Sequence, residues 1–141
     1  MPAYTDLIEL LRTAGLNTDD LDRSALPWFR GCYRGGDLAA AGGLEVLGDT
    51  ALLRSLAVRA DGRGRGLGRA LLGELEVLAR SRGIRDLYLL TETAAEFFAR
   101  HGYAAASRDT APARIRATRQ FAELCPDSAV FMHKPLDERA D

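Results

Sequence analysis

The apolar and polar positions of the first 58 residues follow the pattern of short strands separated by tight turns. Apolar runs and turn signals alternate along this part of the chain, in the order 27–34, Gly35-Gly36-Asp37, 37–47, Gly48-Asp49 and 51–58. Glycine at such positions favours the short turns that join antiparallel strands. The run ALLRSLAV at 51–58 is almost wholly apolar, which is typical of a strand buried on both faces. We therefore predict an antiparallel meander of strands, preceded by a helix that begins at Thr5 and ends at Gly15.

From residue 67 onwards, apolar residues recur at helical spacing. Leu67, Leu71, Leu75 and Leu78 mark one face of a helix, and Gly83 ends it. The later segments alternate between strand and helix patterns, in the order IRDLYLLT, TAAEFFARHGY, 103–108, APARIRATRQFAELC (111–125) and SAVFMHK (128–134). This order predicts a single mixed α/β domain over residues 1–141, with a frayed polar tail at 137–141.

Composition and charge narrow the classes of partner. The 141 residues carry a net charge of −1, so we expect neither a nucleic-acid nor a membrane partner. Arginine supplies all the cationic side chains except Lys134, a bias typical either of anion binding or of a GC-rich genome. No apolar run approaches the ~20 residues of a membrane helix. The N-terminus has no secretory signal pattern, so we predict a cytoplasmic location.

The cysteine pattern indicates neither a disulfide framework nor a metal site. Cys32 and Cys125 show no repeated spacing of the kind that disulfide-rich domains have. A single cysteine is a poor ligand set for a soft metal, so we predict that Cys125 is packed in the core. We expect no bound metal.

Arginine and glycine fill the segment between the third strand and the helix that follows it. The segment reads Arg63-Gly64-Arg65-Gly66-Leu67-Gly68 and is followed by Arg69. Glycine lets backbone N–H groups approach a ligand closely, and a helix N-terminus adds unpaired N–H groups and a partial positive charge. The segment therefore predicts an anion site. It lacks the glycine spacing of a dinucleotide-binding fingerprint and the lysine of a P-loop, which excludes both motifs.

This segment, set between SLAVRAD and RALL, closely resembles the acyl-CoA site of the GNAT superfamily of N-acetyltransferases. The resemblance implies a fold in which the antiparallel meander joins a splayed pair of parallel strands with flanking helices. It also implies acetyl-CoA as the co-substrate. By position, Leu56, Ala57 and Val58 would lie along the pantetheine arm, and Arg63 through Arg69 would wrap the pyrophosphate. The backbone N–H of Ala57 or Val58 would then donate to the oxyanion.

The second landmark of that family is usually N-x-x-A-x-x-F-Y-E-K-x-G-F, and it corresponds here to residues 91–103. The matching residues are Ala94, Phe97, Gly102 and Tyr103. Thr91 replaces the asparagine and is a candidate for substrate binding. Phe98 replaces the tyrosine that is the family's common general acid. Phenylalanine has no proton to give, so that role is vacant or filled elsewhere.

A narrower resemblance covers most of the chain. GLEVLGDTALLRSLAV, LYLLTETAAEFFARHGY and TRQFAELCPDSAV look like the subgroup of arsenic-resistance N-acetyltransferases. The layout near the C-terminus is also similar to the acetyltransferase domain of N-acetylglutamate synthases. GNAT chains usually open with a strand before the first helix, whereas this sequence starts almost directly in the helix. The alternatives are that the first edge strand is missing or that the gene start is placed late.

Acetyl transfer to an amine needs a base for the proton of the amine. Glu45 and Glu92 are the candidates. Glu92 follows a buried strand, where it either faces the cleft or serves as a favourable charge at the start of the next helix. Arg54 interrupts a strand that is otherwise apolar, where a charge needs a partner. Arg54 either holds a substrate carboxylate through a bidentate contact or forms a structural ion pair, for example with Glu45.

Together these features predict an N-acetyltransferase that acts on the amine of a small molecule, either an amino acid or an amino-bearing arsenical. We expect a monomer or a homodimer. The alternative is a CoA-binding sensor or interaction module with little activity. Phe98 allows this alternative, because it stands in place of the tyrosine that is the family's common general acid. His101 is expected to cap a helix C-terminus. The later arginines are expected to be solvated: Arg114, Arg116 and Arg119.

Overall fold

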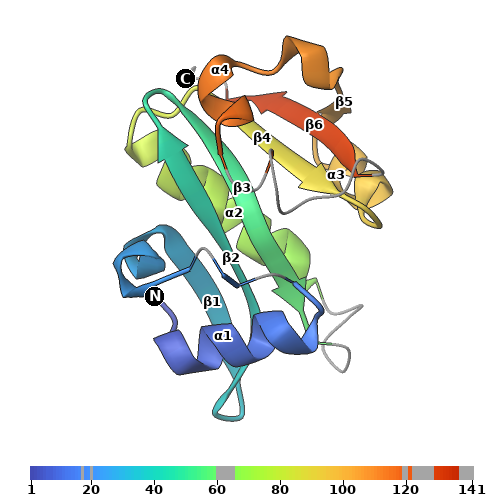
Figure 1. Ribbon diagram of the computed structural model, residues 1–141. Coiled ribbons are helices and arrows are strands. Elements are labelled where there is room, and N and C mark those ends of the chain that lie inside the picture. The colour runs from blue at the N-terminus through green and yellow to red at the C-terminus, as the bar shows by residue number, and fades with distance from the viewer. Residues whose placement is uncertain (17, 20, 60–65, 119–120, 122–128, 137–141) are drawn as a thin grey trace. The chain divides into compact units, whose positions relative to one another are not determined.

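The computed structural model describes residues 1–16, 18–19, 21–59, 66–118, 121 and 129–136 (Figure 1). The chain divides into two compact units. The first unit comprises Met1–Leu44 and Ser55–Leu78, and the second comprises Glu45–Arg54 and Ala79–Asp141. The residues of the predicted tail, 137–141, lie outside the described part of the chain.

The strands form one six-stranded sheet in the order β1-β2-β3-β4-β6-β5. Their bounds are β1 Phe29–Arg34, β2 Asp37–Leu47, β3 Thr50–Val58, β4 Asp86–Thr91, β5 Ala104–Ala105 and β6 Val130–Pro135. The sheet is mixed, because β3 and β4 are parallel whereas β1–β2, β4–β6 and β5–β6 are antiparallel. The predicted mixed α/β class is therefore confirmed.

The helices come before, between and after these strands. They are α1 Tyr4–Thr13, α2 Leu67–Ser81, α3 Ala95–Arg100 and α4 Ala113–Arg116, with 3-10 helices η1 Arg23–Trp28 and η3 Arg108–Thr110. Glycine ends α1 as predicted, since Gly15 has a φ of 79° and the N–H of Leu16 donates to the carbonyl oxygen of Leu11 at 2.9 Å.

The turns of the predicted meander are where the sequence places them. Gly35 and Gly36 join β1 to β2 with φ of 59° and 88°, and a two-residue turn of this kind needs positive φ at both positions. Gly48, with a φ of 70°, lies in the turn between β2 and β3. Both turns confirm the prediction from glycine placement.

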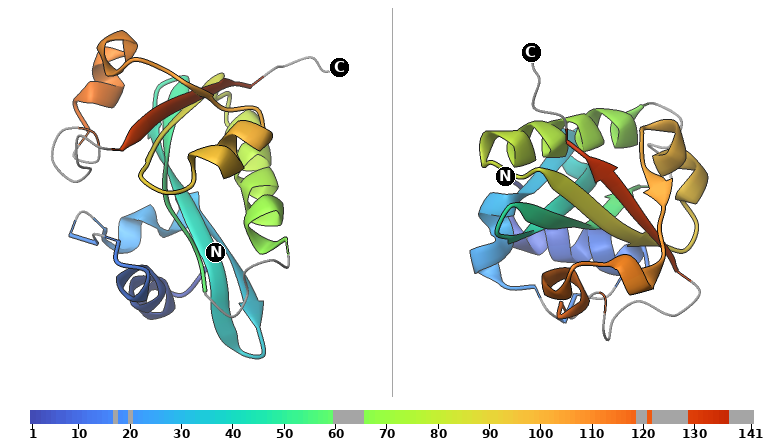
Figure 2. Two further views of the ribbon diagram at one scale, coloured as in Figure 1. Left: turned by 90° about the vertical axis from the view of Figure 1, so that its right-hand side faces the viewer. Right: turned by 90° about the horizontal axis from the view of Figure 1, so that it is seen from above.

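In the first unit, α1 and α2 cover opposite faces of the strands (Figure 2). Leucines of α1 form a buried cluster with strand residues that include Ala41 and Ala57. The next residue of β2, Gly42, faces α2: a Cβ there would lie 2.7 Å from Leu56 Cδ1 and 3.1 Å from Leu75 Cδ1. Because successive strand residues face opposite sides, Ala41 faces α1 and Gly42 faces α2.

The second unit has its own core. Leu52, Ala111, Ile115 and Phe131 form a buried cluster on one face of its strands. Along β4, the ring of Tyr88 stacks on those of Phe131 and His133, with centroid separations of 5.5 Å and 4.6 Å. Burial raises the pKa of Tyr88, and the negative charges of Asp86 and Asp49 raise it further.

The strand predicted over 103–108 is wrong in extent. Only Ala104 and Ala105 pair with β6, and Arg108–Thr110 form η3 instead. The hydroxyl oxygen of Ser107 accepts the N–H of Asp109 at 3.2 Å, which caps this short helix. Serine and aspartate favour such local hydrogen bonds over strand pairing.

The helix predicted over 111–125 is interrupted, since Ala117 and Thr118 lie outside α-helix; residues 119–120 and 122–125 of the prediction lie outside the described part of the chain. Among the described residues of this stretch, α-helix covers only Ala113–Arg116. Two residues later, the hydroxyl of Thr118 donates to the carbonyl oxygen of Ile115 at 2.8 Å and accepts the N–H of Phe121 at 3.2 Å. The Thr118 side chain thus bonds the backbone on both sides of the point where α4 ends, in addition to the bond from its own N–H to the carbonyl oxygen of Ile115 at 3.1 Å.

Candidate functional site

The parallel pair β3 and β4 is joined over a short length. Its register runs from Thr50 opposite Asp86 to Leu52 opposite Tyr88, although β3 continues to Val58 and β4 to Thr91. Beyond the paired stretch, Ser55 has a φ of 57°, and it is the one non-glycine residue with positive φ in the described part of the chain.

A left-handed conformation costs a non-glycine residue about 1–2 kcal/mol. It also interrupts the alternation of side chains along a strand, so β3 changes its geometry between Arg54 and Leu56. Backbone outliers of this kind cluster at functional sites. The sequence analysis missed Ser55, because serine within an apolar strand carries no signal of positive φ.

Arg54 lies immediately before this outlier. Its exposed fraction is 8%, so this residue, which was predicted to bind the substrate, is a buried cation in the second unit. The predicted base Glu45 is half-buried on the neighbouring strand β2. Both residues have interaction partners within the chain. A guanidinium has five N–H donors, so Arg54 can keep an internal partner and still bind a ligand carboxylate.

Thr91 and Glu92 occupy the end of β4. The half-buried Thr91 accepts the N–H of Ala94, the residue just before α3, on its hydroxyl oxygen at 3.0 Å. That hydroxyl keeps its own proton to donate. Glu92 follows the strand and is exposed, so its carboxylate is solvated. β4 thus brings Thr91 and Glu92 together, in the same unit as Arg54 and Glu45.

The predicted pantetheine residues lie in the first unit, after the outlier. Ala57 is 7% exposed and packs against α1, whereas Leu56 and Val58 are half-buried. Leu56 faces α2 through its contact above Gly42. The prediction that 51–58 is buried on both faces therefore holds for Ala51–Arg54 and fails for the half-buried residues that follow.

The start of α2 provides the described part of the predicted anion site. Gly66 is exposed and has a φ of 77°, and its carbonyl oxygen accepts the N–H of Ala70 at 3.0 Å. The first turn of a helix leaves N–H groups without helical partners, and here these belong to Leu67, Gly68 and Arg69. Other predicted loop residues lie outside the described part of the chain: Arg63, Gly64 and Arg65.

Phe98, at the position where the resemblance implies tyrosine, is a core residue. It is 4% exposed, and its ring makes edge contacts with those of Phe97 and Tyr103, at 5.2 Å and 5.5 Å between centroids. Lys134 supports the same helix by donating from Nζ to the carbonyl oxygen of His101 at 3.0 Å. The cap at the C-terminal end of α3 thus includes the lysine, which the sequence analysis did not single out.

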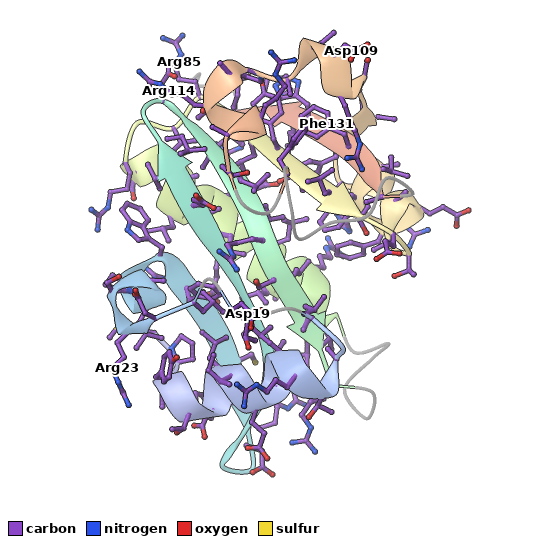
Figure 3. The ribbon with its side chains drawn as sticks, viewed as in Figure 1. Asp19, Arg23, Arg85, Asp109, Arg114 and Phe131 are labelled. Carbon is purple, nitrogen blue, oxygen red and sulfur yellow. The ribbon has the colours of Figure 1, made fainter. Side chains whose placement is uncertain are left out.

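The remaining candidates are scattered. Arg114 and Arg116 are exposed, as expected for solvated arginines, and Arg114 lies against Gly48 in the turn between β2 and β3. Figure 3 shows Arg114 and Arg85 at that end of the second unit. Cys32 is a half-buried free thiol. Arg119 and Cys125 lie outside the described residues.

Searches for a metal centre and for a membrane span gave negative results over the described residues. In the part of the chain that the structure places, no group of three or more His, Cys, Asp or Glu side chains could hold a metal ion. No helix among those same residues is long and apolar enough to cross a bilayer.

The chain is similar in fold to several solved acetyltransferases. It matches N-acetylglutamate synthase from Neisseria gonorrhoeae, complexed with coenzyme A and N-acetyl-glutamate, with a TM-score of 0.80 and 22% identity. That match covers 95% of this chain but only 33% of the synthase, so the chain spans about a third of that protein.

Two further matches cover almost the whole length of both aligned chains. Rv2747 from Mycobacterium tuberculosis, in complex with CoA, has a TM-score of 0.78 and 23% identity over 94% of this chain and 95% of that one. A putative acyl-CoA N-acyltransferase from Klebsiella pneumoniae has a TM-score of 0.73 and 24% identity over 96% and 93%. At such identities the likeness establishes the fold alone.

A sequence model of the acetyltransferase (GNAT) family matches residues 3–103, which is more than half of the chain. The match includes the strands β1–β4, the helices α1–α3 and the segment that was compared with the acyl-CoA site. The chain belongs to the acetyltransferase (GNAT) family.

Proposed function

We propose that this N-acetyltransferase moves the acetyl group of acetyl-CoA to the amine of a small molecule that also carries a carboxylate. An amino acid is the first candidate class and an amino-bearing arsenical with an anionic group is the second. The arsenical rests only on the sequence resemblance of GLEVLGDTALLRSLAV and its companion segments.

The observation that carries this proposal is the burial of Arg54. A cation with an exposed fraction of 8% on an apolar strand is costly unless it serves a structure or a ligand. Its position next to the left-handed Ser55, just beyond the paired stretch of β3, favours a ligand. The guanidinium would hold the carboxylate of the acceptor through two parallel N–H donors.

We assign acetyl-CoA to the segment between β3 and α2. The pyrophosphate would bind the backbone N–H groups of residues 64–69, where Gly66 has the open backbone that such an approach needs. The pantetheine arm would follow the backbone of Leu56–Val58. Two of the similar structures named above are complexes with coenzyme A, which supports acetyl-CoA as the co-substrate.

In the transfer step, the amine nitrogen attacks the thioester carbon, so a C–N bond forms and the C–S bond breaks. The backbone N–H of Val58 would stabilise the oxyanion. Glu92 or Glu45 would take the amine proton, Glu92 through water because its carboxylate is exposed. Phe98 cannot protonate the departing thiolate, so we propose that the thiolate takes its proton from water.

A thiol-trapping assay with a panel of amines tests this function. We expect release of coenzyme A with amines that carry a carboxylate and little release with the matched amines that lack it. Acetyl-CoA binding without release in the presence of any amine would contradict the proposal and support a CoA-binding sensor instead.

A further inference from the structure

A pocket of about 360 Å³ lies in the first unit, between α1 and the strands that it covers. α1 crosses these strands near the start of β2 and the end of β3 (Figure 1). The volume is within the range of about 300–1,000 Å³ that small-molecule sites have. Part of the lining is apolar, because it includes Leu10 and Leu38, each 6% exposed. The pocket is therefore large enough for a small ligand with a hydrocarbon part.

Acidic side chains prevail among the charged residues that line this pocket. They are Asp6 and Glu9 on α1 and Asp37 at the start of β2, and Arg59 just after β3 is the positive residue of the lining. Three carboxylates against one guanidinium give the lining a net charge of −2. A ligand that complements this charge carries positive groups of its own.

The two carboxylates of α1 have no cationic partner in the described part of the chain. The hydroxyl of Tyr33 donates to Asp6 Oδ2 at 2.8 Å and accepts the N–H of Ala3 at 3.1 Å, so a neutral group orients Asp6. Glu9 has neither a hydrogen bond nor an ion pair from its side chain among those same residues. Residues three apart on a helix are neighbours, and like charges there repel. An ammonium group between Asp6 and Glu9 would remove this repulsion.

The third carboxylate is held only loosely. Nη1 of Arg59 lies 3.5 Å from Oδ2 of Asp37, and their side chains are 37% and 72% exposed. Charge-assisted hydrogen bonds are usually shorter, at about 2.7–2.9 Å, and exposed ion pairs contribute little. A carboxylate accepts several hydrogen bonds at once, so Asp37 can bind a second ammonium group beside Arg59.

We infer that this pocket is a binding site for an aliphatic diamine. One ammonium group would lie between Asp6 and Glu9 and the other at Asp37, with the methylene groups on Leu10 and Leu38. Two positive charges match the net charge of the lining. An extended cation fits better than a metal ion, because the described residues contain no group of three or more His, Cys, Asp or Glu side chains that could hold one. The site needs no carboxylate on its ligand, so it does not rest on the proposed function.

Titration calorimetry with putrescine, an aliphatic diamine, tests this site. We expect saturable binding to the parent, with a Kd about tenfold lower than that of butylamine, which has the same carbon chain and a single ammonium group. Magnesium chloride should weaken putrescine binding no more than sodium chloride of equal ionic strength does, because both salts then act by screening.

Single substitutions identify the groups that bind. Glu9→Gln and Asp6→Asn should each raise the Kd of putrescine by about fivefold. Glu74→Gln is the matched control, since Glu74 is exposed on α2 of the same unit, does not line the pocket and takes the same charge with it. This control should keep the parent Kd. Arg59→Gln should lower the Kd, because it removes the positive charge from the lining.

Equal increases of Kd in Glu9→Gln and Glu74→Gln would overturn the inference, since putrescine would then respond to the charge of the whole protein. A parent that shows no saturable binding of putrescine, or that loses it to magnesium at matched ionic strength, would overturn it as well. If Asp6→Asn fails to fold, the exposed Glu9 decides the question through Glu9→Gln. The proposed function is tested separately, by the release of coenzyme A with amines that carry a carboxylate.

Discussion

β4 pairs with its two neighbours in the sheet over different lengths. It pairs with β6 over its whole length, from Asp86 to Thr91, but with β3 only as far as Tyr88. On the β6 side, His133 contacts Tyr88 through its ring and lies with Nε2 2.8 Å from Asp86 Oδ1. On the β3 side, the paired stretch gives way to the buried Arg54 and the left-handed Ser55.

This difference separates stability from ligand binding. Backbone groups and side chains that pair with each other along β4 and β6 already satisfy one another, so changes there should affect stability. Beyond Leu52, β3 is no longer paired with β4, so a change there leaves that ladder intact. Changes along β3 and the segment after it should therefore affect binding of acetyl-CoA or acceptor more than the melting temperature.

The largest effect is expected at Gly66. Replacing it by valine places a branched side chain where backbone N–H groups would meet the pyrophosphate, each bond to a charged group being worth about 1.5–3 kcal/mol. We expect the Kd of acetyl-CoA, measured by titration calorimetry, to rise by roughly two orders of magnitude.

Gly83→Val is the matched control for this change. Gly83 follows the other end of α2 with a φ of 78°, against 77° at Gly66, and a Cβ at either glycine meets no atom of the described residues within 4 Å. Both variants should lose similar stability from the strained backbone, but Gly83→Val should bind acetyl-CoA normally. Equal affinities in the two variants would remove the anion site from the start of α2.

The next effect is expected at Arg54. Arg54→Lys keeps the charge and loses the bidentate geometry, so acceptor KM should rise by roughly ten- to a hundredfold, the equivalent of about 1.5–3 kcal/mol. Acetyl-CoA affinity should not change. The control is Arg30→Lys, since the half-buried Arg30 donates to the carbonyl oxygens of Pro27 and Phe29 and faces no proposed ligand.

The same Arg54 variant also tests the alternative in which Glu45 is its structural partner. In that case the melting temperature should fall and acceptor KM should stay at the parent value. Kinetics and thermal melts on Arg54→Lys therefore decide between a ligand role and an internal ion pair. Destabilisation without a change of KM would end the amino-acid proposal.

The antiparallel meander and helix α2 could be predicted from the sequence, whereas the change of geometry in β3 could not. Turn chemistry is local, so Gly35-Gly36 and Gly48 identified the meander before its strands were seen. Helix α2 was equally clear, because four leucines at helical spacing share one face. These signals depend only on near neighbours in the chain.

The features that the sequence analysis missed or left open depend on tertiary context instead. Positive φ at Ser55 has no signature in the residue type, since the surrounding strands impose it. The helix expected over 111–125 was predicted from its alanines and from the spacing of Ile115, Phe121 and Leu124, but α4 ends at Arg116, just before the point where the hydroxyl of Thr118 bonds the backbone. The predicted bases remain candidates for the same reason: residue type placed Glu45 and Glu92, whereas solvation and partners decide which of them acts.

A smaller effect on rate is expected at Phe98. If the thiolate takes its proton from water, Phe98→Tyr should leave kcat nearly unchanged. The new hydroxyl would enter a site that is 4% exposed, where an unsatisfied polar group costs about 1–3 kcal/mol, so the melting temperature should fall. Steady-state kinetics and thermal melts measure both. A gain in kcat of roughly a hundredfold, the lower range for general-acid catalysis, would instead show that the parent lacks an acid it needs.

The smallest effect is expected at Tyr88, on the side of β4 that pairs with β6, and only in alkaline solution. Burial and the carboxylates of Asp86 and Asp49 raise the pKa of Tyr88 above its ordinary value of about 10, so folding favours the protonated phenol. This contribution to the free energy of unfolding is fully present below pH about 10 and is lost as the pH rises through the raised pKa of the folded state.

Tyr88→Phe removes the titration and keeps most of the ring stacking with Phe131 and His133. The parent should therefore lose melting temperature more steeply than the variant as the pH rises above about 10. The difference between the two proteins is the informative quantity, because they differ in the phenol of Tyr88 alone. The Kd for acetyl-CoA at neutral pH should be equal in parent and variant. A pH-independent difference in melting temperature would mean that Tyr88 contributes through packing alone. An altered affinity for acetyl-CoA would contradict the inference that changes on the β6 side of β4 affect stability and not binding.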